Sequence, residues 1–137
     1  MSTTMKRRAT TKPRIVIREE DHEKLTQLAN GLLDSRPDMA DGLLDELERA
    51  RVARGKAVPA DTVQMGSTVE FGSDSSPTRR VTLVYPRDAD IAEGRISVLT
   101  PIGTALLGLA VGQSIDFMAN DGQSHRLTVL AVEPADA

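Results

Sequence analysis

The sequence predicts an α+β protein in which two short helices precede an antiparallel β-sheet that carries one further short helix. Three observations indicate this class. Between residues 25 and 50 apolar residues recur every three or four positions, the period of an amphipathic helix. From residue 68 onward apolar and polar residues alternate, which is typical of strands. Near the C-terminus an Asp-Gly pair separates two alternating runs and indicates a β-hairpin.

The N-terminal part begins with a predicted strand and helix. Residues 15–17 are a β-branched run that favours a short strand. Asp21 is a suitable N-cap for a helix over residues 22–33, because its carboxylate can accept from the amides of the first turn. The apolar face of this helix consists of Leu25, Leu28, Ala29, Leu32 and Leu33.

A second helix is predicted to start at about Pro37 and to run to about residue 53, where Gly55 ends it. Its apolar stripe consists of Met39 or Ala40 with Leu43, Leu44, Leu47 and Ala50. Two amphipathic helices joined by a short loop predict an antiparallel helical hairpin. At about 1.5 Å per residue the hairpin is only about 20 Å long.

The C-terminal part is predicted to contain five strands, over residues 68–71, 80–85, 96–99, 114–118 and 126–132. The stretch SVLTPIGTALLGLAVG, residues 97–112, has no charge and interrupts this pattern with one Pro and three Gly. We interpret Thr104–Leu107 as one helical turn closed by Gly108, with Leu106, Leu107 and Val111 in the core. Thr100, Pro101, Ile102 and Gly103 are then expected to form a rigid loop with an apolar tip, because Pro101 favours an extended backbone at Thr100.

Composition excludes several function classes. The chain has no Cys, which excludes disulfides and thiol catalysis, and only three aromatic residues, too few for base-stacking platforms. No run approaches the roughly 18 apolar residues of a membrane span, so we expect no membrane contact and a cytoplasmic location. The formal net charge is −3, but residues 1–14 carry five cations and no acid, leaving −8 on the remainder. This basic arm can make weak contacts with nucleic acid, although a solvated tail is the simpler interpretation.

The titratable residues show no catalytic or metal-binding pattern. His22 and His125 are far apart and match no metal motif, so both are expected to be exposed. Asp34, Asp38 and Asp41 cluster at the predicted hairpin tip, and converging carboxylates can hold Mg²⁺. Their ordinary role is to mark helix ends and to interact with the helix dipole. We therefore predict no catalytic residue, no metal site and no cofactor.

The uncharged stretch nevertheless resembles a known signature. Ser97 and the run from Thr100 to Gly108, followed by Val111 and Gly112, resemble the C-terminal signature of bacterial Gre-type transcription elongation factors, with Gln113 at a position that is usually Asp. The segment 63–69 resembles the first strand and turn of the same domain. Two further segments are similar to the Rnk subfamily, the regulators of nucleoside diphosphate kinase: Leu83-Val84-Tyr85-Pro86 and Ala40-Asp41-Gly42-Leu43.

The resemblance covers about residues 14–133 and implies a division of the chain. We expect a disordered basic arm at 1–13, a short strand with the helical hairpin at 14–55, and a Gre-type domain with an FKBP-like fold at 56–134. In Gre-type factors this domain docks on a coiled coil of RNA polymerase at the rim of the secondary channel. A long hairpin enters the channel, where acidic residues at its tip help to hold a catalytic Mg²⁺ for RNA cleavage.

The resemblance leaves three functions to compare. The first is a monomeric regulator that binds RNA polymerase through Thr100, Pro101, Ile102 and Gly103. It would not cleave RNA, because the acidic tip of a hairpin only about 20 Å long would stay near the mouth of the channel. The second is a transcript-cleavage factor that uses Asp34, Asp38 and Asp41. The third is a peptidyl-prolyl isomerase, which the implied FKBP-like fold suggests, but the scarcity of aromatic residues disfavours its apolar pocket. We favour the first.

Overall fold

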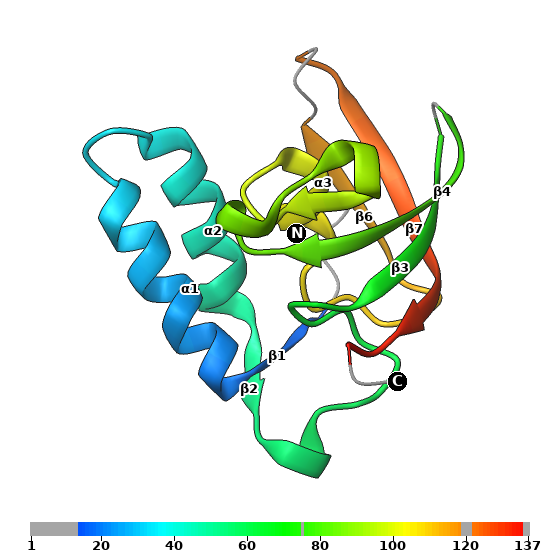
Figure 1. The fold of residues 1–137 in the computed structure, drawn as a ribbon, viewed down its shortest axis with the longest axis horizontal. Helices are drawn as coiled ribbons and strands as arrows, with labels where there is room; N and C mark the ends of the chain where they lie inside the picture. Colours follow the sequence, from blue (N-terminus) through cyan, green and yellow to red (C-terminus); the bar gives the residue numbers. More distant parts are fainter. Residues whose placement is uncertain (1–13, 75, 119–121, 136–137) are drawn as a thin grey trace, which may run out of the picture.

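The computed structural model describes residues 14–74, 76–118 and 122–135, so the predicted basic arm at 1–13 lies outside the described residues. Two helices lie side by side on one flank of a curled β-sheet, and a pair of short strands lies at their base (Figure 1). The α+β class is therefore confirmed. Within the described residues no helix is long and apolar enough to cross a membrane.

The two helices are close to their predicted positions but start and end differently. Helix α1 (Glu19–Leu32) begins directly after strand β1 (Val16–Arg18), so Arg18 takes the N-cap position and the prediction of Asp21 as the cap is wrong. Helix α2 (Pro37–Arg49) starts at a proline, whose fixed φ suits the first turn. With 14 and 13 residues, each helix is about 20 Å long.

Strand β2 (Arg51–Ala53) occupies residues that the sequence assigned to the end of the second helix. The helix stops at Arg49 because Ala50 adopts an extended backbone, with ψ of 145°. Strands β1 and β2 then pair in parallel, with Val16 opposite Arg51 and Ile17 opposite Val52. The pairing satisfies backbone groups of β1, a long-range requirement that outweighs local helix propensity. A short 3₁₀ helix, η2 (Gly55–Ala57), follows.

Within the described residues five strands form the larger sheet, in the order β5-β4-β3-β7-β6. Their bounds are Thr68–Ser73 for β3, Ser76–Val84 for β4, Arg95–Ser97 for β5, Ser114–Met118 for β6 and Ser124–Glu133 for β7. The prediction of a fully antiparallel sheet is wrong for one pair, since β4 and β5 are parallel. The 3₁₀ helices η3 (Pro86–Asp88) and η4 (Ile91–Glu93) form the connection that makes this pairing possible.

Strands β6 and β7 form the antiparallel pair that the Asp-Gly signal predicted. Residues 119–121 at the tip, which include Asn120 and Asp121, lie outside the described residues. The register places Ile115 opposite Leu127, and both side chains are buried. Among the described strands β6 is therefore an edge strand of the larger sheet, paired with β7.

The core is one cluster of buried residues that extends from the helices into the sheet. It includes Leu25 and Leu43 of the helices and Phe71 and Leu83 of the sheet. Leu106 and Leu107 are fully buried, as predicted, but Val111 is 42% exposed and its assignment to the core is wrong. Leu109 is buried instead, because the chain turns at Gly108 with a φ of +80° before it reaches residue 111.

Gly108 lies where strand β1 meets the segment that follows α3 (Pro101–Leu106). Its carbonyl accepts a hydrogen bond from the Val16 amide at 3.1 Å, and its own amide donates to the Val63 carbonyl at 2.8 Å. A Cβ at this position would lie 2.8 Å from the Cβ of Ile15, and the positive φ already favours glycine. The close approach of β1 to residue 108 therefore requires a residue without a side chain at this position.

We predict that Gly108→Ala lowers the free energy of unfolding by about 1–3 kcal/mol more than Gly112→Ala does. Gly112 also has a positive φ, of +90°, but none of the described atoms lies within 4 Å of the place where its Cβ would be, so the two substitutions share backbone strain and differ in the steric conflict. Chemical denaturation of both variants measures the difference. Equal losses would show that β1 does not need the close approach.

Candidate partner-binding surface

The segment predicted to be an apolar loop, Thr100–Gly103, is the start of helix α3 (Pro101–Leu106). The Thr100 hydroxyl accepts from the Gly103 amide at 3.0 Å and donates to the Ser97 carbonyl at 2.8 Å. These bonds cap the helix, and Pro101 suits its first position. The expectation of a free loop tip is therefore wrong: Gly103 is buried, Ile102 packs against the core, and Pro101 keeps part of its surface exposed.

Gly103 cannot be replaced without moving the backbone. A Cβ at this position would overlap the carbonyl oxygen of Ser97, which approaches the helix closely. The glycine in this segment is thus explained by the packing of α3 against the end of β5. Of the four predicted contact residues, Pro101 is the one that the structure places beside a groove at the surface.

The acidic residues predicted at the hairpin tip are exposed. Asp34 lies in the turn between the helices, while Asp38 and Asp41 lie in the first half of α2. Among the described residues no group of three or more His, Asp or Glu side chains is placed to hold a metal ion. Asp38 alone of the three lines the groove that also contains Pro101.

The groove lies between α2 on one side and α3 and β6 on the other, with a volume of about 470 Å³. Its walls and floor are formed by Asp38, Met39, Gly42, Asp45, Glu46, Leu99, Pro101, Thr104, Ala105, Ile115, Asp116, Phe117 and Met118. The floor is apolar, and among the residues that the structure describes the lining contains four acidic residues and no Lys or Arg. This surface combines one member of each predicted site, Pro101 and Asp38, with residues that the sequence did not single out.

Two of the four acids in the groove already have partners. Glu46 is buried and forms an ion pair with Arg49, and Asp116 pairs with Arg126 at 3.2 Å. Among the described residues Asp38 and Asp45 have no ion-pair partner, and both are exposed. Their charges face solvent at the edge of an apolar floor, which gives the groove a negative edge that a cationic partner can approach.

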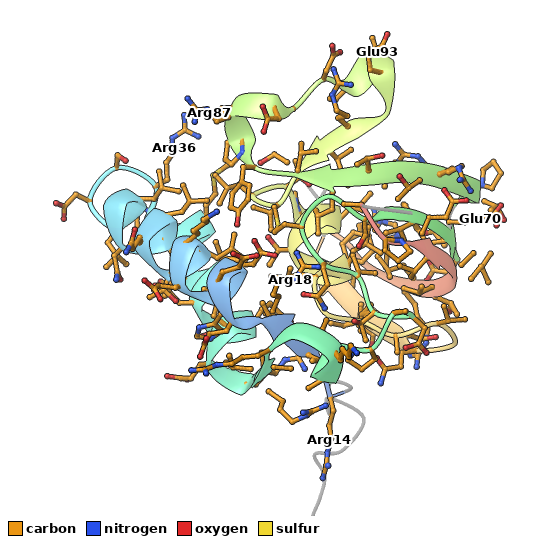
Figure 2. All side chains as sticks on the ribbon, turned by 60° about the horizontal axis from the view of Figure 1, so that its bottom comes forward. Arg14, Arg18, Arg36, Glu70, Arg87 and Glu93 are labelled. Carbon is orange, nitrogen blue, oxygen red and sulfur yellow. The ribbon has the colours of Figure 1, made fainter. Side chains whose placement is uncertain are left out.

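A buried carboxylate joins α1 to the sheet. Asp21 is 5% exposed, accepts a hydrogen bond from the Tyr85 hydroxyl at 2.8 Å and lies 3.5 Å from a guanidinium nitrogen of Arg18. Figure 2 shows Arg18 between the base of α1 and the sheet domain. Burial raises the pKa of Asp21 above its usual value, while the Tyr85 hydrogen bond and Arg18 oppose this. Burial and the neighbouring carboxylate raise the pKa of Tyr85.

Sequence reasoning missed the role of Asp21, although a signal was present. Asp21 precedes Leu25 by four residues and therefore shares its helix face, so a polar residue at that position needs a partner in the core. The partner, Tyr85, lies 64 residues away in the sequence and could not be found from local spacing. This contact is structural, since it faces the interior and not the groove.

Both histidines are less exposed than predicted. His22 lies in α1, and its Nε2 is 2.9 Å from the carbonyl oxygen of Leu47 in α2. The His125 side chain is only 15% exposed, and its ring lies 5.9 Å from that of Phe117. His125 is also 3.5 Å from a carboxylate oxygen of Asp74. The prediction of exposed histidines is wrong because contacts between elements cover both rings.

Comparison with known proteins agrees with this fold. Residues 58–134 match the family model "Transcription elongation factor, GreA/GreB, C-term", and residues 13–52 match the model "Rnk N-terminus". The chain therefore belongs to the GreA/GreB family of transcription elongation factors, in the subfamily that carries an Rnk-type N-terminus. Family membership makes it a transcription-related regulatory protein.

Particular relatives support this placement. The chain is 37% identical to the "Regulator of nucleoside diphosphate kinase" of Escherichia coli K12 over 123 residues, which cover 89% of this chain and 90% of the relative. It is 36% identical to "Transcription elongation factor GreA" of Rhodospirillum rubrum, covering 80% of this chain and 73% of the relative. A solved GreA/GreB elongation factor from Nitrosomonas europaea has a TM-score of 0.70 and 38% identity, covering 88% and 99% of the two chains.

We predict that Asp21→Asn reduces the dependence of stability on pH. Because folding raises the pKa of Asp21, the folded state favours its protonated form, and this contribution to stability is greatest at acid pH. It is lost as the pH rises from about 4 through the raised pKa of the folded state. Asparagine keeps a carbonyl acceptor for Tyr85 without a charge. Relative to the wild type, the variant should therefore gain stability as the pH rises.

Urea denaturation of both proteins between about pH 4 and pH 8 measures this difference. Asp34→Asn provides the control, because Asp34 is exposed in the turn between the helices. A stability difference between wild type and Asp21→Asn that stays constant over this range would contradict the assignment of Asp21 as the buried titrating group.

Proposed function

We propose that this protein regulates transcription by binding bacterial RNA polymerase at the rim of the secondary channel, without stimulating transcript cleavage. The observation that carries the proposal is a Gre-type C-terminal part joined to helices of only 14 and 13 residues. The resemblance to Gre-type factors supplies the docking site on the polymerase coiled coil. The same resemblance supports the division at 55/56 and the FKBP-like description of the sheet domain, which both remain proposals.

The length of the helices supports the absence of cleavage. Each helix extends about 20 Å, and the hairpin of a cleavage factor must reach through the channel to the RNA end. A catalytic role also requires that acidic groups converge, since geometry precedes any argument from chemistry. The exposure of Asp34, Asp38 and Asp41 supports this part of the proposal, since among the described residues no group of three or more acidic or His side chains converges.

Pro101 is the residue that we propose to contact the polymerase directly. Thr100 and Gly103 form the helix cap that fixes its position, and Ile102 anchors the segment by packing against the core. A rigid, half-buried apolar residue at the edge of a groove loses little conformational entropy on binding. Bound in this way, the protein would occupy the docking site of cleavage factors and compete with them.

We predict that Pro101→Ala weakens binding to core RNA polymerase by about fivefold or more, because an apolar contact at the edge of the groove is lost. Pro86→Ala is the control: Pro86 also opens a short helix and is half-buried, but it does not line the groove. Biolayer interferometry with immobilised polymerase measures both affinities. Wild-type affinity in Pro101→Ala would remove Pro101 from the contact.

We also predict that the protein does not stimulate RNA cleavage in backtracked elongation complexes, and that it inhibits cleavage by an added GreA. Labelled transcripts resolved on a gel measure both effects, with GreA alone as the positive control. Stimulated cleavage that Asp38→Asn or Asp41→Asn abolishes would instead establish a cleavage factor. The contact of the basic arm with nucleic acid stays a prediction of the sequence.

A further inference from the structure

Gly42 occupies a position in α2 that the fold does not explain. It lies six residues into a helix of 13, where glycine is less favourable than alanine by about 0.5–1 kcal/mol. Its backbone is helical, so no positive φ requires it. No atom of the described residues lies within 4 Å of the place where its Cβ would be, so no described neighbouring element requires it either. Gly42 does, however, line the groove between α2, α3 and β6.

Two methionines stand on opposite walls of the same groove. Met39, one turn before Gly42 on α2, is 38% exposed, and Met118 at the end of β6 is 62% exposed. Methionine side chains are flexible and polarisable, so they adapt to apolar partners of different shape. The missing side chain at Gly42 leaves open space between α2 and the apolar floor, which consists of Leu99, Ala105, Ile115 and Phe117, with Pro101 at its edge.

From these features we infer that the groove is a docking site for a basic amphipathic helix of a partner protein. An apolar side chain of that helix would enter the space above Gly42, between Met39 and Met118. The charge of the groove selects the partner: among the described residues Asp38 and Asp45 are exposed without ion-pair partners, and no Lys or Arg lines the groove. Lysine or arginine residues that flank the apolar stripe of the incoming helix would therefore pair with these acids.

This inference deepens the proposed function, since it assigns to the polymerase contact a helix of basic amphipathic character and adds α2 to the binding surface. It rests on the proposed function only for the identity of the natural partner. The groove itself can be tested with a probe that contains no polymerase. Failure of the groove and failure of polymerase binding are therefore distinguishable.

The test titrates the full chain with a synthetic Leu/Lys amphipathic helical peptide and follows backbone amide shifts by NMR. We expect shifts concentrated at Met39, Gly42 and Met118, and no comparable shifts with the peptide in which Glu replaces Lys. Asp38→Asn with Asp45→Asn should weaken binding about threefold to tenfold at low salt and reduce its salt dependence.

Glycine substitutions provide the decisive comparison. Gly42→Leu should weaken peptide binding by about tenfold or more because it fills the space above the helix. Gly31→Leu is the matched control, since Gly31 lies in α1, also has nothing within 4 Å of its Cβ position, and does not line the groove. Thermal unfolding verifies that both variants fold, and Gly42→Ala, which fits the helix better, should unfold at a temperature no lower than the wild type.

Three results would overturn the inference: shifts that map elsewhere, equal binding of both peptides, or equal affinities of Gly42→Leu and Gly31→Leu. The same two leucine variants are then compared for binding to core RNA polymerase. Loss of binding in Gly42→Leu alone supports the groove as the polymerase contact. If the wild type binds the Lys peptide in the groove but does not bind polymerase, the proposed function fails and the docking site stands.

Discussion

Strand β1 is held on both sides, and the position of the helices depends on this. On one side it pairs with β2, and on the other the Val16 amide donates to the carbonyl of Gly108. The buried side chain of Gln64 completes the second side: its amide nitrogen donates to the Val16 carbonyl and its oxygen accepts from the Arg18 amide, both at 2.8 Å. A single side chain thus takes the place of a neighbouring strand and satisfies two partly buried backbone groups.

Helices as short as α1 and α2 have little stability alone, so their attachment determines whether they form. The β1 contacts fix the start of α1, and the hydrogen bond between Tyr85 and Asp21 fixes its first turn against the sheet domain. Leu43 and Leu47 then bury the inner face of α2. The outer edge of α2 is left facing α3 and β6, and the groove between them is a consequence of this rigid attachment.

The features that could be predicted from the sequence have local signals. The apolar period located both helices, and the alternating runs located the strands of the larger sheet. Strand β2 and the parallel pairing of β4 with β5 were missed because both depend on long-range partners.

The groove was predictable only in part, because it too depends on contacts between residues far apart in the sequence. Resemblance singled out Pro101 and charge singled out Asp38, but their common location depends on the packing of α2 near α3. No pattern in the sequence singled out Met118, and Gly42 was quoted only as part of the Rnk-type segment Ala40-Asp41-Gly42-Leu43, without a role in binding.

Three glycines show how fold and function can be separated in this chain. At Gly103 a side chain would overlap the Ser97 carbonyl, and at Gly108 it would meet Ile15 while the backbone adopts a positive φ. Both are required by the packing of the protein on itself. At Gly42 neither reason applies, and the glycine weakens the helix that contains it. A residue that lowers stability, in open space within a groove with an acidic edge, is best explained by something outside the chain that needs the space.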